Sequence, residues 1–411
     1  MTFRTGAENK RNTRCNVIDS VNYKTTLHAC YLGYITQALV VNLLPILFVI
    51  FRDKFGLSYT MLGSLVMVNF ITQLITDVFA IKFVDKIGRR ATAVLAHAFA
   101  AVGMILLAVL PVALPQPYVG LIVSSIVFAI GGGLIEVIVS PIVESLPSEA
   151  KASSMSLLHS FYSWGQVLIV LLSTVALLFI GHDLWFVLPL VWAALPIVTL
   201  FKFAKAPLVP VEDKSKRTPI KTLVTSKFFL LALLLMVCSG ASEQAMAQWA
   251  SLFAERGLGI SKTLGDLLGP CLFAVMMGLM RTLYGVKGQK INMRKTLLVS
   301  SVLCMLSFVI AAIVPIPAVS ILGCALCGLS VALMWPGMLS LTAAGYPSGG
   351  TAMFAILALG GDLGCSAGPW LTGVVADGSS LNMGLLAAIG FPALMLVGLV
   401  VLKVPRLSGK S

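Results

Sequence analysis

Residues 61–111 read MLGSLVMVNFITQLITDVFAIKFVDKIGRRATAVLAHAFAAVGMILLAVLP, two apolar runs joined by a short basic turn. Each run, 61–81 and 91–111, has about 20 residues, the length at which an α-helix crosses a hydrocarbon core of roughly 30 Å. A backbone in lipid must pair its N–H and C=O groups internally, so each run is expected to be helical. The stretch therefore predicts two transmembrane helices whose connection lies at one membrane surface.

The same pattern extends over the whole chain of 411 residues, of which 58% are hydrophobic and 11% are charged. A soluble domain carries about 25% charged residues, so a water-soluble globular protein is excluded. Apolar runs occur at 27–51, 61–81, 91–111, 118–143, 156–180, 184–203, 227–250, 265–285, 295–314, 317–341, 351–375 and 383–403. We therefore predict an all-α polytopic membrane protein whose twelve transmembrane helices form two pseudo-symmetric six-helix bundles. The predicted parts are a tail at 1–26, a bundle at 27–205, a linker at 206–226, a bundle at 227–404 and a tail at 405–411.

The distribution of basic residues predicts the orientation in the membrane. The connections that follow the odd-numbered runs lie on one side of the membrane. They contain only four of the 29 Lys and Arg residues: Arg52, Lys54, Arg256 and Lys262. Because cytoplasmic loops are rich in Lys and Arg, both termini and the linker are expected in the cytoplasm of a multi-pass protein of the cell membrane. The net charge of +13 then reflects insertion and contact with anionic lipid, and no nucleic-acid partner is expected.

An internal repeat supports the division into two bundles. The segment GLSYT at 56–60, before the second run, recurs as GISKT at 259–263 before the eighth. The dipeptide Pro-Ser at 147–148, after the fourth run, recurs at 347–348 after the tenth. Repeats related by an axis along the membrane normal are typical of alternating-access transporters, which bind substrate between the halves. A non-transporting receptor could share this layout, so the repeat predicts architecture more than activity.

The turn between the second and third runs carries a family signature. Asp85–Arg90 (DKIGRR) resembles the D-[RK]-x-G-[RK]-[RK] motif of the major facilitator superfamily, although Ile81 stands where the family pattern begins with Gly. The resemblance implies twelve helices and a gate at the cytoplasmic surface. The predicted gating residues are Asp77, Asp85, Gly88, Arg89 and Arg90. Without the family, a basic stop that only fixes topology explains the turn equally well.

A second resemblance concerns a branch of that superfamily. The stretches Gly131–Glu136 (GGGLIE) and Leu157–Phe161 (LLHSF), together with Glu243 and Trp249, are similar to the fucose–galactose–glucose:proton symporter family. This implies proton symport of a small sugar or glycoside. The first run, Leu27–Phe51, lacks the acid that fucose transporters of this family have there.

Glu136 is the candidate for proton coupling. It lies near the middle of the fourth run, behind three glycines that permit close backbone packing or a ligand's approach. An acid at bilayer depth costs several kcal/mol, so it is a functional candidate by default. A carboxyl group buried away from a cation could exchange a proton near neutral pH. The alternative is a permanently protonated Glu that orders the bundle.

Other polar side chains inside the runs are candidate substrate contacts. Glu243 and Gln248 suit sugar hydroxyls, each of which donates and accepts hydrogen bonds, and Trp249 offers a face to a sugar ring. The alternative for each is polar packing between helices. The predicted substrate-binding residues are Gln37, Asn42, Glu136, His159, Tyr162, Gln166, Glu243, Gln248, Trp249 and Asp362. His97 is expected in the core, and Arg281 is expected against loop backbone or acids such as Asp77.

No catalytic constellation, phosphate-binding loop or metal-ligand spacing occurs, so an enzyme, a cofactor and a metal site are not expected. The Cys324-x-x-Cys327 spacing is interpreted as packed thiols. The sequence predicts a secondary active transporter that moves a small polar solute by alternating access, with the proton as the expected coupling ion and the monomer as the working unit. Proton-coupled efflux of drugs or metabolites is the main alternative. A nutrient receptor that binds without transport is a third.

Overall fold

A computed structural model describes residues 23–146, 151–209, 220–287, 292–346 and 349–402. In this part of the chain twelve helical segments are long and apolar enough to cross a membrane, and no strand occurs. The predicted all-α fold with twelve spans is confirmed. Residues 1–22 and 405–411 of the expected tails and residues 210–219 of the expected linker lie outside the described residues.

The first six spans are formed by α2 to α8. Their bounds are α2 (Lys24–Phe55), α3 (Tyr59–Ile87), α4 (Arg89–Ala113), α5 (Pro117–Ser145), α6 (Lys151–Ile180), and α7 (Val187–Trp192) followed by α8 (Ala194–Lys205). A short helix, α9 (Ile220–Val224), lies within the stretch expected as linker. Several helices extend past the apolar runs: α2 and α3 continue through polar residues such as Arg52 and Lys86 in their last turns.

The last six spans are more broken. They are α10 (Lys227–Ala247) with α11 (Ala250–Leu252) and η2 (Phe253–Gly257), α12 (Lys262–Asp266) with η3 (Leu267–Cys271) and α13 (Leu272–Lys287), α14 (Met293–Ile313), α15 (Pro317–Val331) with α16 (Met334–Gly345), α17 (Gly350–Gly378), and α18 (Leu381–Ala387) with α19 (Gly390–Val401). Pro336 explains the break between α15 and α16, since proline has no N–H and its ring displaces the carbonyl four residues earlier. That carbonyl belongs to Ala332 and accepts a hydrogen bond from Arg281 Nε at 2.9 Å.

The repeated segments before the second and eighth spans have the same local structure. Gly56 and Gly259 both adopt a positive φ, 66° and 68°, which glycine tolerates without strain. Each glycine ends one span, and the serine two residues later precedes the next helix, α3 or α12. The sequence repeat therefore marks equivalent turns in the two halves.

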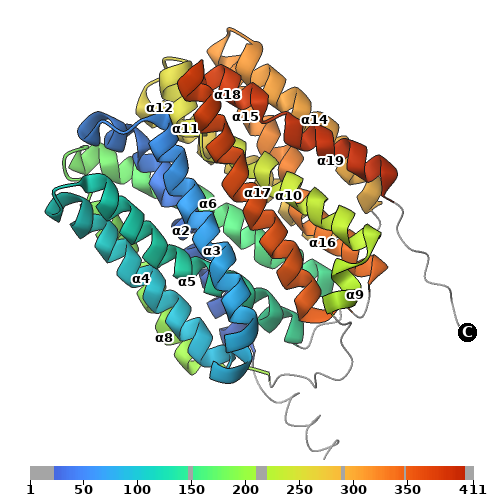
Figure 1. Cartoon of the computed structure of the whole chain (residues 1–411). Coiled ribbons are helices and arrows are strands. Elements are labelled where there is room, and N and C mark those ends of the chain that lie inside the picture. Colours follow the sequence, from blue (N-terminus) through green and yellow to red (C-terminus); the bar gives the residue numbers. More distant parts are fainter. Residues whose placement is uncertain (1–22, 147–150, 210–219, 288–291, 347–348, 403–411) are drawn as a thin grey trace, which may run out of the picture.

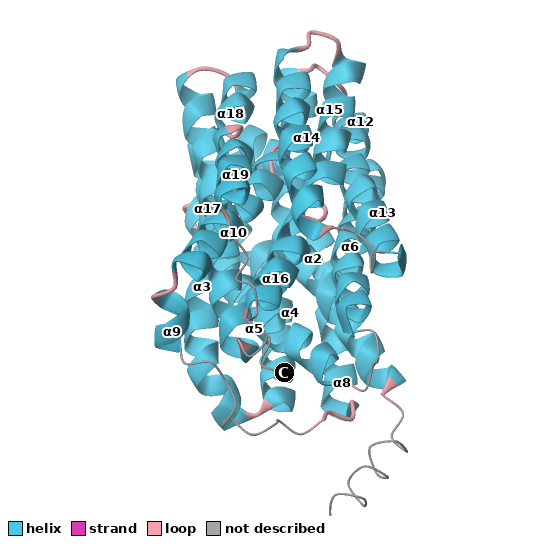
Figure 2. Ribbon diagram, turned by 90° about the vertical axis from the view of Figure 1, so that its right-hand side faces the viewer, coloured by secondary structure: helices cyan, strands magenta, loops and turns pink. Residues whose placement is uncertain are grey.

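The helices form two groups that meet along two seams. Within the chain's first half α4 packs on α5 and α2 on α6, and within the second half α10 packs on α17 and α14 on α15. Between the halves, α3 packs along α17, as Figure 1 shows, and α6 packs along α13. We call the end at which α2 begins and α8 ends the terminal end. The opposite end is where α12, α15 and α18 begin (Figure 2).

Candidate functional site

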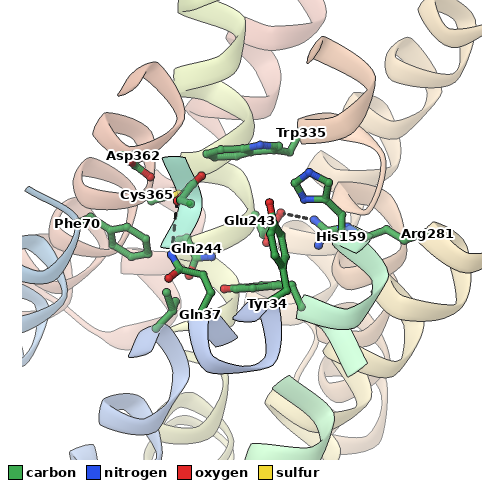
Figure 3. Close-up of a pocket in the computed structure, with 13 residues that line it drawn as sticks. Tyr34, Gln37, Phe70, His159, Glu243, Gln244, Arg281, Trp335, Asp362 and Cys365 are labelled. Atoms are coloured by element: carbon green, nitrogen blue, oxygen red, sulfur yellow. Dashed lines mark hydrogen bonds and ion pairs between the residues drawn. The ribbon is translucent and has the colours of Figure 1, made fainter. Parts of the chain in front are cut away.

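A cavity lies between the two halves, with walls from α2, α3, α5 and α6 on one side and from α10, α13, α16 and α17 on the other. Water-sized molecules can occupy about 60 Å³ of it, room for a few waters. The lining residues, most of them labelled in Figure 3, are Tyr34, Gln37, Val41, Phe70, Glu136, His159, Tyr162, Glu243, Gln244, Arg281, Trp335, Asp362 and Cys365.

Glu136 reaches the cavity from α5, where the glycine run lets neighbouring side chains approach the helix. A Cβ on Gly132 would lie 3.1 Å from Gln37 Oε1 and 3.1 Å from Gln73 Cδ. Gln37 Nε2 donates to Gln73 Oε1 at 2.7 Å and to Glu136 Oε2 at 3.4 Å. The glycines therefore admit an amide network beside the carboxyl group of Glu136.

Glu243 forms a buried ion pair that the sequence did not predict. Arg281 Nη2 donates to Glu243 Oε2 at 3.0 Å, and both side chains are buried. Arg281 also donates to Ser163 Oγ at 3.1 Å, across the seam between α13 and α6. Arg281 was expected against loop backbone or acids such as Asp77. The structure places it on the Ala332 carbonyl at the break between α15 and α16 and on the acid Glu243 of α10. The sequence did contain a signal for this residue, because an arginine inside an apolar run is a functional candidate.

Aromatic residues complete the walls. Tyr34 hydrogen bonds with Ser140 Oγ at 2.6 Å and meets His159 edge-on, with ring centroids 5.0 Å apart. Trp335 lies against Gly361, where a Cβ would come within 2.1 Å of the indole. Trp335, labelled in Figure 3, is a second residue that sequence reasoning missed. In the sequence Trp335 is an aromatic residue beside a proline, and no spacing of polar residues marked it as a site residue.

Six of the ten predicted substrate residues line this cavity: Gln37, Glu136, His159, Tyr162, Glu243 and Asp362. The other four, Asn42, Gln166, Gln248 and Trp249, are buried but do not line the cavity. Two of them bond to lining residues: Asn42 donates to Tyr162 OH at 3.4 Å and Gln248 to Gln244 Oε1 at 2.7 Å. Their roles in binding stay predictions. Trp249 donates to Pro369 O at 3.0 Å, a carbonyl of α17, and so lies toward the opposite end.

The predicted gating residues separate into two places. Gly88 joins α3 to α4 with φ of 90°, and Arg89 and Arg90 bond at this terminal end to Ser145 Oγ at 3.1 Å and Ala206 O at 2.9 Å. The side chain of Asp85 lies outside the described residues. Asp77 is fully buried deeper in α3 and faces α17.

The opposite end is closed by polar contacts between the halves. Arg256 binds Asp53 with two contacts of 2.7 and 2.9 Å. Asp377 of α17 accepts a hydrogen bond from the Thr60 N–H at 2.8 Å, and also bonds with the Thr60 hydroxyl.

A third contact joins Thr174 to Asp266 at 3.2 Å, and Lys262 binds the same carboxylate at 2.9 Å. An ion pair within the first half, Lys54 with Asp183 at 2.9 Å, lies at this end too. The hydrogen bond and charge of Lys54 hold the pKa of the Asp183 carboxyl below its usual range.

The fold agrees with that of known transporters. The family model described as Major Facilitator Superfamily matches residues 30–369. No curated protein sequence matches the chain. Among solved structures, the chain is similar to the E. coli fucose:proton symporter (15% identity, TM-score 0.69, covering 93% of this chain and 100% of that chain). It is also similar to a D-xylose–proton symporter (15% identity, TM-score 0.72, 95% and 100%) and to a nucleoside transporter, NupG (14%, 0.70, 92% and 100%).

At these identities the likeness to solved structures shows the fold alone. The family resemblance inferred from Asp85–Arg90 is confirmed by the family match, which covers most of the chain. The chain therefore belongs to the major facilitator superfamily of membrane transporters.

Proposed function

We propose that the protein is a proton-coupled symporter of a small polar solute, a sugar or glycoside, and that it works by alternating access. One observation carries this proposal: Glu136 from the first half and the Glu243–Arg281 pair from the second half face the same cavity at the seam. A ligand bound there touches both halves, so it can influence how they move relative to each other.

The lining suits a polyhydroxylated ligand. Gln37 and Gln244 offer amides, Tyr34 and Tyr162 offer hydroxyls, and Trp335 offers an aromatic face. Sugar hydroxyls both donate and accept, so groups of both kinds can be satisfied at once. A hexose is larger than the few waters that the cavity admits in this state, so loading requires the halves to separate. Solved structures with this fold include symporters of fucose and xylose.

Glu136 is proposed as the coupling group because of its sparse contacts. Gln37 Nε2 donates to Glu136 in a long hydrogen bond of 3.4 Å, whereas Glu243 is bound to a guanidinium. A carboxylate without a cation is costly inside a membrane protein, so Glu136 is the acid that we expect to gain and lose a proton. We propose that the terminal end faces the cytoplasm of the cell membrane, so the closed opposite end faces outward.

Proteoliposomes that contain the purified chain test this function. A panel of radiolabelled sugars should include one that accumulates with alkalinisation of the outside medium. Glu136→Gln should abolish accumulation against a gradient and retain counterflow exchange, whereas the exposed-acid control Asp183→Asn should behave as wild type. Dye extrusion without any sugar response would instead establish the efflux alternative. Unimpaired concentrative uptake by Glu136→Gln would remove Glu136 from coupling.

A further inference from the structure

Asp77 and Asp362 meet where α3 packs against α17, at the seam between the two halves. The helices run antiparallel, since Thr60 bonds with Asp377 near the opposite end and Gly63 lies against Trp370 further along. Continued along the same register, Asp77 falls beside Asp362. Their side chains are 0% and 1% exposed, and the two carboxyl groups are within hydrogen-bonding reach of each other.

Within the described part of the chain, nothing donates a hydrogen bond to three of the four carboxyl oxygens: Asp77 Oδ1, Asp77 Oδ2 and Asp362 Oδ2. The described ion pairs all use other acids. A carboxylate can only accept, so two carboxyl groups bond to each other only when one of them carries a proton. Like charges in contact inside a protein cannot both ionise. A contact between these two carboxyl groups therefore requires a proton on one of them.

The surroundings fit such a shared proton. A Cβ on Gly133 would lie 3.0 Å from Asp77 Oδ1, so the glycine run of α5 makes room for this carboxyl group. Glu136, also on α5, is the acid nearest to this pair, and Cys365 of α17 neighbours Asp362. From the other helices packed on α3 and α17, no described charged group acts on the pair. The cation of the cavity, Arg281, is bound to Glu243.

We propose that Asp77 and Asp362 form a second proton-binding site, which joins the two halves through one shared proton. While the proton is held, one carboxyl O–H donates to the other carboxylate and α3 stays against α17. When the O–H bond breaks and the proton passes to water, two carboxylates remain in contact and repel each other. The seam then separates, so its contact weakens as the pH rises. This site does not depend on the coupling role proposed for Glu136 or on any substrate.

Infrared spectroscopy of the full chain in lipid nanodiscs tests the shared proton. The measurement uses the Glu136→Gln background, which removes the neighbouring carboxyl group, and a titration from about pH 5 to about pH 9, the range that buried carboxyl groups reach. We expect a protonated-carboxyl C=O band that disappears as the pH rises. Adding Asp77→Asn and Asp362→Asn together should abolish the band, because a single variant keeps one buried carboxyl group, and adding Asp183→Asn should leave it. Absence of the band at every pH, or its persistence in the double Asn variant, overturns the proposal.

A distance measurement tests the consequence for the seam. Fluorophores at Ile87 of α3 and Val224 of α9 would lie on different halves at exposed positions, and α9 packs on α17. In wild type the distance should increase as the pH rises. In Asp77→Asn the amide donates as a protonated acid does, so the distance should stay short at every pH, and Asp362→Asn provides the same test if the first variant does not fold. An equal increase in wild type and in the variants overturns the proposal, whichever solute the protein carries.

Discussion

Arg281 determines which acid of the cavity is held as a carboxylate. Its guanidinium binds Glu243, Ser163 Oγ and the Ala332 carbonyl, so three elements of the packing converge on one side chain. The charges are buried, with 4% exposure of the Arg281 side chain and 8% of Glu243. Removing one partner of such a pair leaves an uncompensated charge, which is costly, whereas removing both is tolerated better.

Arg281→Met should therefore lower the free energy of unfolding by about 3–5 kcal/mol. The double variant Glu243→Gln with Arg281→Met should recover part of that loss, because it leaves no buried charge unpaired. Thermal unfolding in detergent, followed by tryptophan fluorescence, measures both. Arg90→Met, which removes an exposed arginine at the terminal end, serves as the control. A double variant less stable than Arg281→Met alone would contradict a direct pairing.

Gly133, on the α5 wall of the cavity, provides a second test by a single substitution. Gly133→Ala places a Cβ 2.9 Å from Gln73 O and 3.0 Å from Asp77 Oδ1. The helices α3 and α5 must shift, so we expect a loss of stability of about 1–3 kcal/mol, the usual cost of overpacking. Gly390→Ala is the matched control, since a Cβ there meets nothing within 4 Å. Equal thermal stability of the two variants would show that α5 is not packed tightly at Gly133.

At the scale of elements, the prolines direct contacts between helices. Pro336 frees the Ala332 carbonyl for Arg281, and Pro369 provides the carbonyl that accepts from Trp249. Hydropathy predicted the twelve spans because each needs about 20 apolar residues to cross lipid. It could not predict which carbonyl meets which donor, since that depends on the register between helices distant in sequence. For this reason Trp249, expected to stack on a sugar, lies against α17, and Arg281 was missed.

At the opposite end, an acid of the second half caps a helix of the first half. Asp377 at the end of α17 accepts the Thr60 N–H in the first turn of α3, where a negative charge is favoured by the helix dipole. Asp377→Ala should loosen the opposite end, so the distance between labels at Gln116 and Ser379 should increase. Ser58→Ala is the control: it removes a cap from the Met61 N–H within one half, at a cost of about 1 kcal/mol, and should leave that distance unchanged. An equal distance in wild type and Asp377→Ala would exclude a latch at this position.

At the scale of the whole molecule, the two ends of the seam use different chemistry. The opposite end is held by one ion pair between the halves and a helix cap, whereas the part of the α3–α17 seam nearer the terminal end meets at two acids. Neighbouring residues of α2 show how contacts divide between the halves. Asp53 binds Arg256 of the second half, and Lys54 binds Asp183 of the first. Only the first of these pairs has to break if the halves rock apart at the opposite end.

This difference between adjacent pairs provides a test of alternating access. Cysteines at Asp53 and Arg256, joined by a cleavable bis-methanethiosulfonate reagent, should stop counterflow of the transported solute in proteoliposomes, and a reductant that cleaves the bridge should restore it. The same bridge between cysteines at Lys54 and Asp183 lies within one half and should leave counterflow intact. The seven described native cysteines are buried, which limits their reaction with the reagent. Counterflow that survives the Asp53–Arg256 bridge would mean that solute crosses while the opposite end stays closed, which alternating access forbids.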